Sequence, residues 1–338
     1  MTHVHFVGSI GFDTAEEVFR EVGKSVGAHL KRCPDGEVGG RRLWVSWQYP
    51  LLRSSPYLKV VLDRMPAGLG MCLMRVAPGV KPKEIHFGEL GYAREAWASY
   101  QDFLVARQRG DLPKDVRFQV CLPTPFAIIG AFVAPEDVPV VLPAYEAAMI
   151  REVERIVARI PPGDLAIQWD VCIEMIMWDG RFAQMPGFPG MEQVFRAAFQ
   201  RISAAVPSEA ELGVHLCYGD LDAAHFIEPI DTGKAVELAN LIAEATEHPL
   251  AWVHLPVPAD RSDDAYFAPL KGLSLDPGCE LFLGLVHAAD GAEGTRRRIE
   301  AARRAAPSFG IATECGIARS RTVETVREIL AAHAQAAQ

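Results

Sequence analysis

The chain has 338 residues and a formal net charge of −9, and 49% of its residues are hydrophobic. This hydrophobic content is enough for a large core, and the acidic balance argues against a nucleic-acid-binding face, which is basic. The sequence contains no run of about 18 apolar residues and no signal-peptide pattern, so we expect neither a membrane span nor secretion. Seven cysteines spread over a long chain do not suit a disulfide framework, which indicates a protein of the reducing cytoplasm.

Helices are the easiest elements to place along the chain. Seven segments carry apolar residues at a spacing of about 3.6, which is typical of helices with one buried face. These segments are residues 15–26, 92–108, 143–159, 191–206, 232–246, 291–306 and 322–333.

Short apolar runs lie between the helical segments and predict buried parallel strands. They are residues 4–7, 29–32, 118–122, 166–169, 212–216, 251–254, 281–286 and 310–312. Eight strand–helix units in one unbroken chain predict a closed (β/α)8 barrel, a TIM barrel, with residues 1–338 as a single domain. The second strand is the weakest: residues 41–83 are expected to form an elaborated loop, and residues 71–76 are a competing strand.

Polar and metal-binding residue types gather where the predicted strands end. In barrels of this kind the functional groups sit at the carboxyl ends of the strands, so these positions are the candidate site. They are Ser9, Asp35, Glu37, Thr124, Asp170, His215, Cys217, His254, His287, Glu314 and Cys315.

One pair among these residues has the spacing of metal ligands. His215 and Cys217 are two residues apart at the end of a strand, so their side chains point to the same side. Cys315 follows the eighth strand and is expected to face them across the barrel mouth. Two thiolates and an imidazole favour zinc over magnesium or calcium. Alone, the His-x-Cys pair would more simply be a buried histidine beside a core cysteine, and we interpret the other cysteines mainly as packing.

Five short segments carry a resemblance to a known family. They are Gly-Ser-Ile at 8–10, Leu-Pro-Thr-Pro at 122–125, Ile-Gln-Trp-Asp at 167–170, His-Leu-Cys-Tyr at 215–218 and Glu-Cys-Gly-Ile at 314–317. With them the chain resembles the catalytic C-terminal barrel of cobalamin-independent methionine synthase. The same superfamily holds uroporphyrinogen decarboxylase and coenzyme M alkyltransferases. The resemblance implies that His215, Cys217 and Cys315 bind zinc and that Asp170 binds an amino-acid substrate.

The chain also departs from the family pattern at three strand ends. Val171 and Cys172 follow Asp170 where the family has Glu-Pro. His254 stands where the family has its fourth zinc ligand, a glutamate, so we expect His254 to be either a fourth ligand or a substrate contact. His287 stands where the synthases carry an acidic residue. The resemblance therefore implies a single-barrel relative with a modified pocket rather than a methionine synthase.

The resemblance also implies roles in catalysis. A zinc site of this kind activates a substrate thiol for attack on an electrophilic carbon, usually a methyl group. Asp170 would hold an ammonium or hydroxyl group of the substrate, and Glu37 would do the same or relay protons. His287, in a polar cluster with Asp290 and Glu293, suits general acid or base work.

Six further residues are expected to bind substrate, and several have plainer explanations. They are Ser9, Asp35, Thr124, Trp169, Tyr218 and Arg261. The Pro-Asp-Gly sequence that contains Asp35 is also typical of a surface turn, which equally accounts for Glu37. Trp169 and Tyr218 would stack on a flat ligand or simply pack in the barrel. Arg261 would clamp a carboxylate or phosphate, or belong to a helix start.

Two rivals accompany the leading hypothesis, a zinc-dependent methyl- or alkyltransferase that acts on a small-molecule thiol and an alkyl donor. The first is a lyase or decarboxylase on the same barrel that works through Asp170 and histidines without a metal. The second is a barrel that binds a small molecule without turnover. Metal content separates the first rival from the leading hypothesis, and dependence of turnover on His215 separates the second. No pattern in the sequence predicts the oligomeric state.

Overall fold

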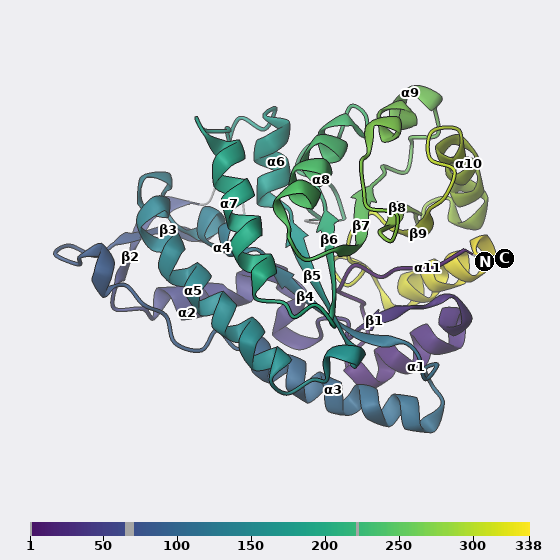
Figure 1. Cartoon of the computed structure of the whole chain (residues 1–338), viewed down its shortest axis with the longest axis horizontal. Helices are drawn as coiled ribbons and strands as arrows, with labels where there is room; N and C mark the ends of the chain where they lie inside the picture. The colour runs from purple at the N-terminus through teal and green to yellow at the C-terminus, as the bar shows by residue number, and fades with distance from the viewer. Residues whose placement is uncertain (1, 65–70, 221–222) are drawn as a thin grey trace.

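A computed structural model describes residues 2–64, 71–220 and 223–338. Its main sheet has seven parallel strands that curl around a central axis, in the order β1-β4-β5-β6-β7-β8-β9 (Figure 1). The strands are β1 (Arg32–Pro34), β4 (Arg117–Pro123), β5 (Leu165–Val171), β6 (Glu211–Leu216), β7 (Leu250–Pro256), β8 (Glu280–Val286) and β9 (Gly310–Thr313). The parallel α/β architecture expected from the sequence is therefore confirmed.

The first of the eight expected strands, residues 4–7, does not form a regular ladder. Val4 instead makes isolated parallel bridges to Leu30, next to β1, and to Ile311 in β9. The flanking strands are short, since β1 has three residues and β9 has four, which leaves little edge for a longer ladder. The second strand also begins later than predicted, at Arg32 rather than at residue 29. The N-terminal segment thus touches both edges of a seven-stranded sheet, and a complete eight-stranded TIM barrel is not confirmed.

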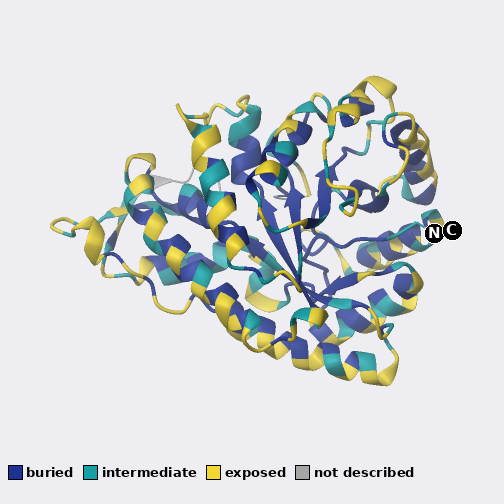
Figure 2. Cartoon of the chain, viewed as in Figure 1, coloured by how far each residue is buried: buried dark blue, intermediate teal, exposed yellow. Residues whose placement is uncertain are grey.

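Helices surround the curled sheet (Figure 1) and turn their apolar faces toward it, which leaves their outer faces exposed (Figure 2). The α-helices are α1 (Ala15–Val26), α2 (Tyr49–Arg53), α3 (Tyr92–Arg109), α4 (Pro125–Phe132), α5 (Val138–Val157), α6 (Ile173–Asp179), α7 (Met191–Ala204), α8 (Gly233–Ala245), α9 (Asp264–Phe267), α10 (Gly291–Arg303) and α11 (Val323–Ala336). Within the described ranges no helix is long and apolar enough to span a membrane.

The elaborated loop predicted for residues 41–83 contains regular structure. It holds a kinked 3-10 segment, η2 (Gly39–Gln48), then α2 and an antiparallel pair of strands, β2 (Leu58–Arg64) and β3 (Cys72–Val76). The competing strand expected at residues 71–76 is β3, but it pairs with β2 outside the main sheet. Residues 65–70 lie outside the described part of the chain. Helix α4 after β4 and helix α6 after β5 were not predicted.

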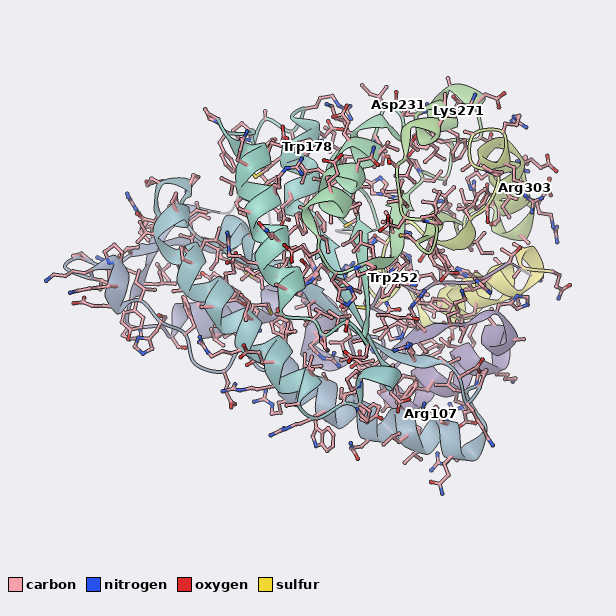
Figure 3. All side chains as sticks on the ribbon, in the orientation of Figure 1. Arg107, Trp178, Asp231, Trp252, Lys271 and Arg303 are labelled. Atoms are coloured by element: carbon pink, nitrogen blue, oxygen red, sulfur yellow. The ribbon has the colours of Figure 1, made fainter. Side chains whose placement is uncertain are left out.

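Large side chains fill the interior of the curled sheet below the strand ends. Trp252 of β7 is fully buried and lies near the centre of the molecule (Figure 3). Its indole Nε1 donates to Oε1 of Gln168 on β5, 3.3 Å away. Gly213 of β6 lies between them, and a Cβ at this position would come within 2.1 Å of the Trp252 ring. A glycine is therefore required where this indole crosses β6, and the packed layer forms the floor of the site above.

Candidate metal centre

Three neighbouring strands place polar side chains at one level. The register pairs Asp170 of β5 with His215 of β6, and His215 with His254 of β7. All three side chains are buried, with His254 entirely inaccessible. Because residues two apart on a strand share a side, Cys217 follows His215 on the same face just beyond the end of β6.

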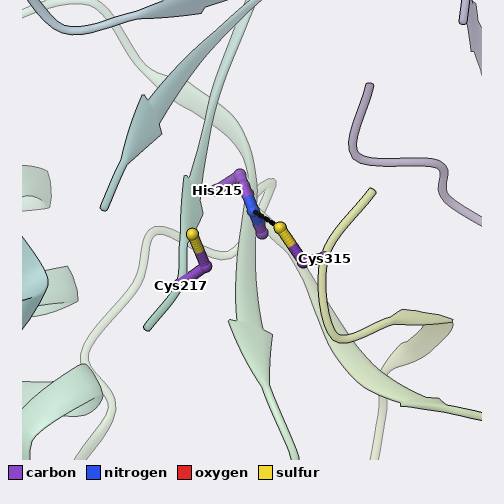
Figure 4. Close-up of side chains that lie close together, drawn as sticks. All are labelled: His215, Cys217 and Cys315. Atoms are coloured by element: carbon purple, nitrogen blue, oxygen red, sulfur yellow. Dashed lines mark hydrogen bonds between the residues drawn. The ribbon is translucent and has the colours of Figure 1, made fainter. Parts of the chain in front are cut away.

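His215, Cys217 and Cys315 form a compact group of potential metal ligands (Figure 4). One ligand atom from each lies within 4.8 Å of the others, and all three residues are buried. The Sγ of Cys315 is 3.7 Å from Nε2 of His215. Ligand atoms roughly 2.0–2.3 Å from a tetrahedral zinc are about 3.3–3.8 Å from one another. The donor types and the 3.7 Å separation of Cys315 and His215 therefore fit a zinc ion, and separations up to 4.8 Å would have to shorten when an ion binds.

His254, which the sequence suggested as a fourth ligand or a substrate contact, contacts Thr313 and His215. Its Nε2 lies 3.0 Å from the carbonyl oxygen of Thr313, and its Nδ1 lies 2.7 Å from Nδ1 of His215. Because a carbonyl only accepts, Nε2 of a neutral His254 carries the proton and Nδ1 must accept from His215. His215 is then protonated at Nδ1, which leaves the lone pair of its Nε2 facing Cys315. In this arrangement both ring nitrogens of His254 have partners in the protein, and His254 is placed to orient the imidazole of His215.

Burial keeps both imidazoles neutral. The pKa of His215 is well below its usual range because of burial and the neighbouring His254, and burial lowers the pKa of His254 to about 3. A neutral imidazole is the form that binds a metal ion. The electrostatics therefore agree with the hydrogen-bond chain from Thr313 to His215.

The two thiols lie among further sulfur and nitrogen atoms. A thiol–thiol contact with Cys172 and burial raise the pKa of Cys217, and a contact with Cys217 and burial raise that of Cys315. The thiols therefore keep their protons unless a cation replaces them. Nη2 of Arg319 lies 3.6 Å from Sγ of Cys315 and supplies positive charge beside the group.

A cavity opens directly above these ligands. It encloses about 850 Å³ of empty space, part of which is open to solvent. Its walls come from the strand ends, from η2, from the loop before α7 and from the loop after β6. The lining residues are Val7, Ser9, Glu37, Leu43, Trp44, Val45, Ser46, Ala131, Asp170, Cys172, Ile173, Met185, His215, Cys217, Gly219, Asp220, Phe226, Cys315, Gly316 and Arg319.

Two buried carboxyl groups, Asp170 and Glu37, face the cavity and form no salt bridge with the described residues. Asp170 accepts a hydrogen bond from Nε2 of Gln168 at 2.8 Å and one from Nε1 of Trp44 at 3.3 Å. Burial and the nearby Glu37 hold the pKa of Asp170 well above its usual range, and burial raises the pKa of Glu37 to about 7. Such a pair can accept hydrogen bonds from an ammonium group or hold a proton.

Backbone strain marks this part of the wall. Glu37 and Trp44 are non-glycine residues with positive φ, at 49° and 50°. Residues in such sparsely populated regions concentrate at functional sites. Ser9 completes this side: its buried hydroxyl has no hydrogen-bond partner in the described part of the chain, and a Cβ on Gly316 would lie 2.1 Å from it. The glycine after Cys315 therefore lets Ser9 approach the metal centre.

Of the thirteen candidates from the sequence, Ser9, Glu37, Asp170, His215, Cys217 and Cys315 line this cavity, and His254 lies beneath it. The remaining six lie elsewhere, and each has a partner or a packing environment of its own. They are Asp35, Thr124, Trp169, Tyr218, Arg261 and His287.

Two of these six residues, Asp35 and Thr124, are held by polar partners outside the cavity. Asp35 forms a salt bridge with Arg41, at 2.7 Å, and caps the turn of the Pro-Asp-Gly sequence. Thr124 caps the start of α4 and donates to the buried carboxyl of Glu174. These contacts give Asp35 and Thr124 structural positions next to the site rather than in it.

The aromatic candidates and Arg261 also lie apart from the cavity. Trp169 is buried in the hydrophobic core on the opposite face of β5 from Asp170, and the hydroxyl of Tyr218 donates to Asp179. Arg261 lies over the ring of Tyr266, with its guanidinium 4.7 Å from the ring centroid, and donates to a backbone carbonyl. The plainer sequence explanation, packing, fits the two aromatic residues.

His287 belongs to a cluster different from the one expected. Asp290 is paired with Arg298, at 2.7 Å, rather than with His287. The Nε2 of His287 lies 2.9 Å from the carbonyl oxygen of Val257, and its Nδ1 faces Glu314 at 3.7 Å. Burial lowers the pKa of His287 to about 4 and raises that of Glu314 to about 7.

Sequence reasoning missed several residues of the site. Trp44 and Arg319 reach it from loops, where no periodic pattern indicates the direction of a side chain. Arg319 follows the Glu-Cys-Gly-Ile segment by two residues, which was the available signal for it. Asp220, which pairs with Arg319 at 3.3 Å, was visible only as the residue that ends the His-Leu-Cys-Tyr-Gly-Asp sequence.

Comparison with known proteins relates the molecule to solved structures alone. No family model matches the chain, and no curated protein matches it. A B12-independent methionine synthase from Shewanella sp. W3-18-1, solved in complex with selenomethionine, matches with a TM-score of 0.62 and 14% identity, over 96% of this chain and 86% of that one. The chain has the fold of this synthase structure.

A second structure agrees with the first. A putative vitamin-B12-independent methionine synthase from Listeria monocytogenes matches with a TM-score of 0.56 and 13% identity, over 98% of both chains. The resemblance to the methionine synthase family inferred from the five sequence segments is therefore confirmed at the level of the fold. At these identities a common fold does not carry an activity from one protein to another.

Proposed function

We propose that the protein is an enzyme that transfers a methyl or other alkyl group to a small-molecule thiol at a zinc site formed by His215, Cys217 and Cys315. The convergence of these three buried ligand atoms within 4.8 Å, at the floor of a cavity, is the observation that carries the proposal. Zinc bound there would leave a fourth position for the thiol and would lower its pKa.

The protein's own groups would prepare this position. The hydrogen bond from Nδ1 of His215 to His254 fixes the tautomer of His215, so its Nε2 stays available as a ligand. The guanidinium of Arg319, 3.6 Å from Sγ of Cys315, would offset part of the negative charge that two thiolates and a substrate thiol bring together.

The carboxyl groups on the other side of the cavity would hold the thiol substrate. Asp170 and Glu37 face the same space without a cationic partner, so an ammonium group on the substrate would find two acceptors there. Ser9 would add its unpartnered hydroxyl. The thiol end would then point to the metal centre and the amino end to the carboxyl groups.

Three further expectations complete the proposal. We propose that residues 4–7 act as the eighth strand of a closed barrel, because Val4 bridges both edges of the sheet. We also propose a single domain over residues 1–338, and residence in a reducing compartment, the cytoplasm, because oxidation of Cys217 or Cys315 would remove a ligand.

Metal content tests the proposal directly. Protein purified without added metal is analysed for zinc, with Cys217→Ser and Cys315→Ser beside it, and Cys279→Ser as the matched control because Cys279 lies outside the site. About one zinc per chain in the wild type and in the control, and a loss of at least about tenfold in the two ligand variants, is expected. Equal, low metal content in all four proteins would refute zinc-dependent transfer and favour the metal-free lyase.

A further inference from the structure

The cavity above the candidate metal ligands is lined by two kinds of side chain. The charged ones are Glu37, Asp170, Asp220 and Arg319, and we call the part of the cavity that they line the inner half.

The apolar ones are Leu43 and Val45 of η2, Ile173 at the start of α6, Met185 and Phe226. We call the part that they line the outer half, because it includes the exposed side chain of Leu43. Trp44 belongs to both parts, since its Nε1 lies 3.3 Å from Asp170.

The charged side chains of the inner half already have an ion-pair partner or a proposed role. Asp220 is paired with Arg319, at 3.3 Å, and with Arg321, at 3.1 Å. Asp170 and Glu37 are the acceptors proposed for the amino end of the thiol substrate. A second substrate that approaches from the mouth therefore meets apolar side chains, and the described lining leaves no charged group to pair with it.

The two basic residues next to Leu43 in the sequence already have acidic partners. Arg41 and Arg42 immediately precede Leu43 on η2, but Arg41 is paired with Asp35 at 2.7 Å and Arg42 with Asp13 at 3.1 Å. An anionic group in the outer half would lose its hydration without gaining a partner. A neutral apolar group would instead remove exposed apolar surface from water, including that of Leu43, which is 59% exposed.

We infer that the outer half binds the body of the alkyl donor, and that this donor is a neutral molecule with an aromatic or branched aliphatic body. The inference rests on the proposed function, which assigns the inner half to the thiol. It names the class of the second substrate and excludes donors with an anionic body.

A matched pair of probes tests this preference. Zinc-loaded full-length protein is titrated with 2-methoxynaphthalene and with 6-methoxy-2-naphthoate, which has nearly the same shape but carries a carboxylate, and binding is followed by the fluorescence of the naphthalene ring. The neutral probe is expected to bind at least about tenfold more tightly, because the anion is desolvated without a partner. Equal binding, tighter binding of the naphthoate or binding of neither probe would overturn the inference.

A positive charge introduced at the mouth of the cavity tests whether the two probes bind there. Leu43→Lys is expected to weaken binding of the neutral probe and to strengthen binding of the naphthoate. The dissociation constant of the naphthoate divided by that of the neutral probe should therefore fall by at least about tenfold. Ile230→Lys is the control, because Ile230 is 64% exposed and does not line the cavity. An unchanged ratio in Leu43→Lys, or the same change in Ile230→Lys, would place the probes elsewhere and overturn the inference.

The zinc measurement tests the proposed function, and the probe measurement tests the neutral donor, so one claim can be refuted while the other stands. Protein that contains no zinc but prefers the neutral probe would refute the proposed transfer reaction and keep an apolar binding site. Protein that contains zinc but binds both probes equally would keep the metal centre and refute the neutral donor. Each titration is therefore accompanied by a zinc determination on the same sample.

Discussion

The Nδ1 atoms of His215 and His254 lie 2.7 Å apart, and this contact connects the carbonyl of Thr313 to the metal centre through two imidazole rings. Only one of two nitrogens so close together can carry a proton, so the chain of donors has a single direction. His254 thereby decides which nitrogen of His215 faces Cys315.

The first prediction concerns His254. His254→Ala should still bind one zinc at saturating metal, but with an affinity about 10- to 100-fold lower, because His215 loses the partner that fixes its tautomer. Competition with a coloured chelator measures the affinity, and His86→Ala, at an exposed histidine that does not line the cavity, is the control. An unchanged affinity for zinc would show that His254 only packs beside the site, and a loss of zinc as complete as in Cys217→Ser would show that it is a ligand.

The second prediction concerns Asp170. Asp170→Asn should weaken binding of cysteamine, a thiol with an amino group, by about 10- to 100-fold, because a charged hydrogen bond is lost. Binding of 2-mercaptoethanol should change much less. Both are measured by the visible absorption of cobalt-substituted protein, with Asp13→Asn as an exposed control. An equal effect on both thiols would show that Asp170 does not recognise the amino group.

The third prediction is a pH dependence at Glu174, where burial raises the pKa to about 7 from the usual 4.5. A raised folded-state pKa contributes stability that is present below the unfolded pKa, about 4.5, and is lost as the pH rises through 7. Glu174→Gln keeps an acceptor for Thr124 but has no proton to lose.

At pH 8 the Glu174→Gln variant should therefore be more stable than the wild type by on the order of 2–3 kcal/mol, with little or no gain at pH 4. Urea unfolding at the two pH values measures the difference, and Glu293→Gln, at an exposed position, is the reference. A constant difference between the two pH values would mean that Glu174 does not titrate in this range.

The fourth prediction concerns the floor of the site. Gly213→Ala should destabilise the protein by about 3 kcal/mol or more, because the new Cβ would lie 2.1 Å from the Trp252 ring and the indole cannot move freely in a packed interior. Gly278→Ala, where a Cβ meets nothing within 4 Å, should change the stability by less than about 1 kcal/mol. Similar changes in the free energy of unfolding for both variants, measured with urea, would disprove the close approach of the Trp252 indole to Gly213.

The residues that sequence reasoning placed well are those on strands. Alternation along β6 put His215 and Cys217 on one face, and the parallel order of the strands brought Cys315 to the same end. A side chain on a strand can point in only two directions, so a pattern of apolar neighbours is enough to orient it.

Residues whose place depends on loops could not be predicted in this way. Trp44 reaches Asp170 through a backbone with positive φ, which nothing in its side chain favours. The contacts of His254 could not be predicted either, because they involve the carbonyl of Thr313, and backbone carbonyls carry no sequence signal. The sequence also did not indicate that residues 4–7 make only isolated bridges, since an apolar run does not show how much edge its neighbours offer.

The N-terminal segment that touches both sheet edges has a consequence for synthesis on the ribosome. Val4 emerges long before its partner Ile311, which is followed closely by Cys315. The bridge between the two sheet edges and the third candidate metal ligand therefore become available from the same stretch of chain. A nascent polypeptide that has not reached this stretch carries only His215 and Cys217 of the three candidate ligands, so the edge contact and the complete ligand set would form together.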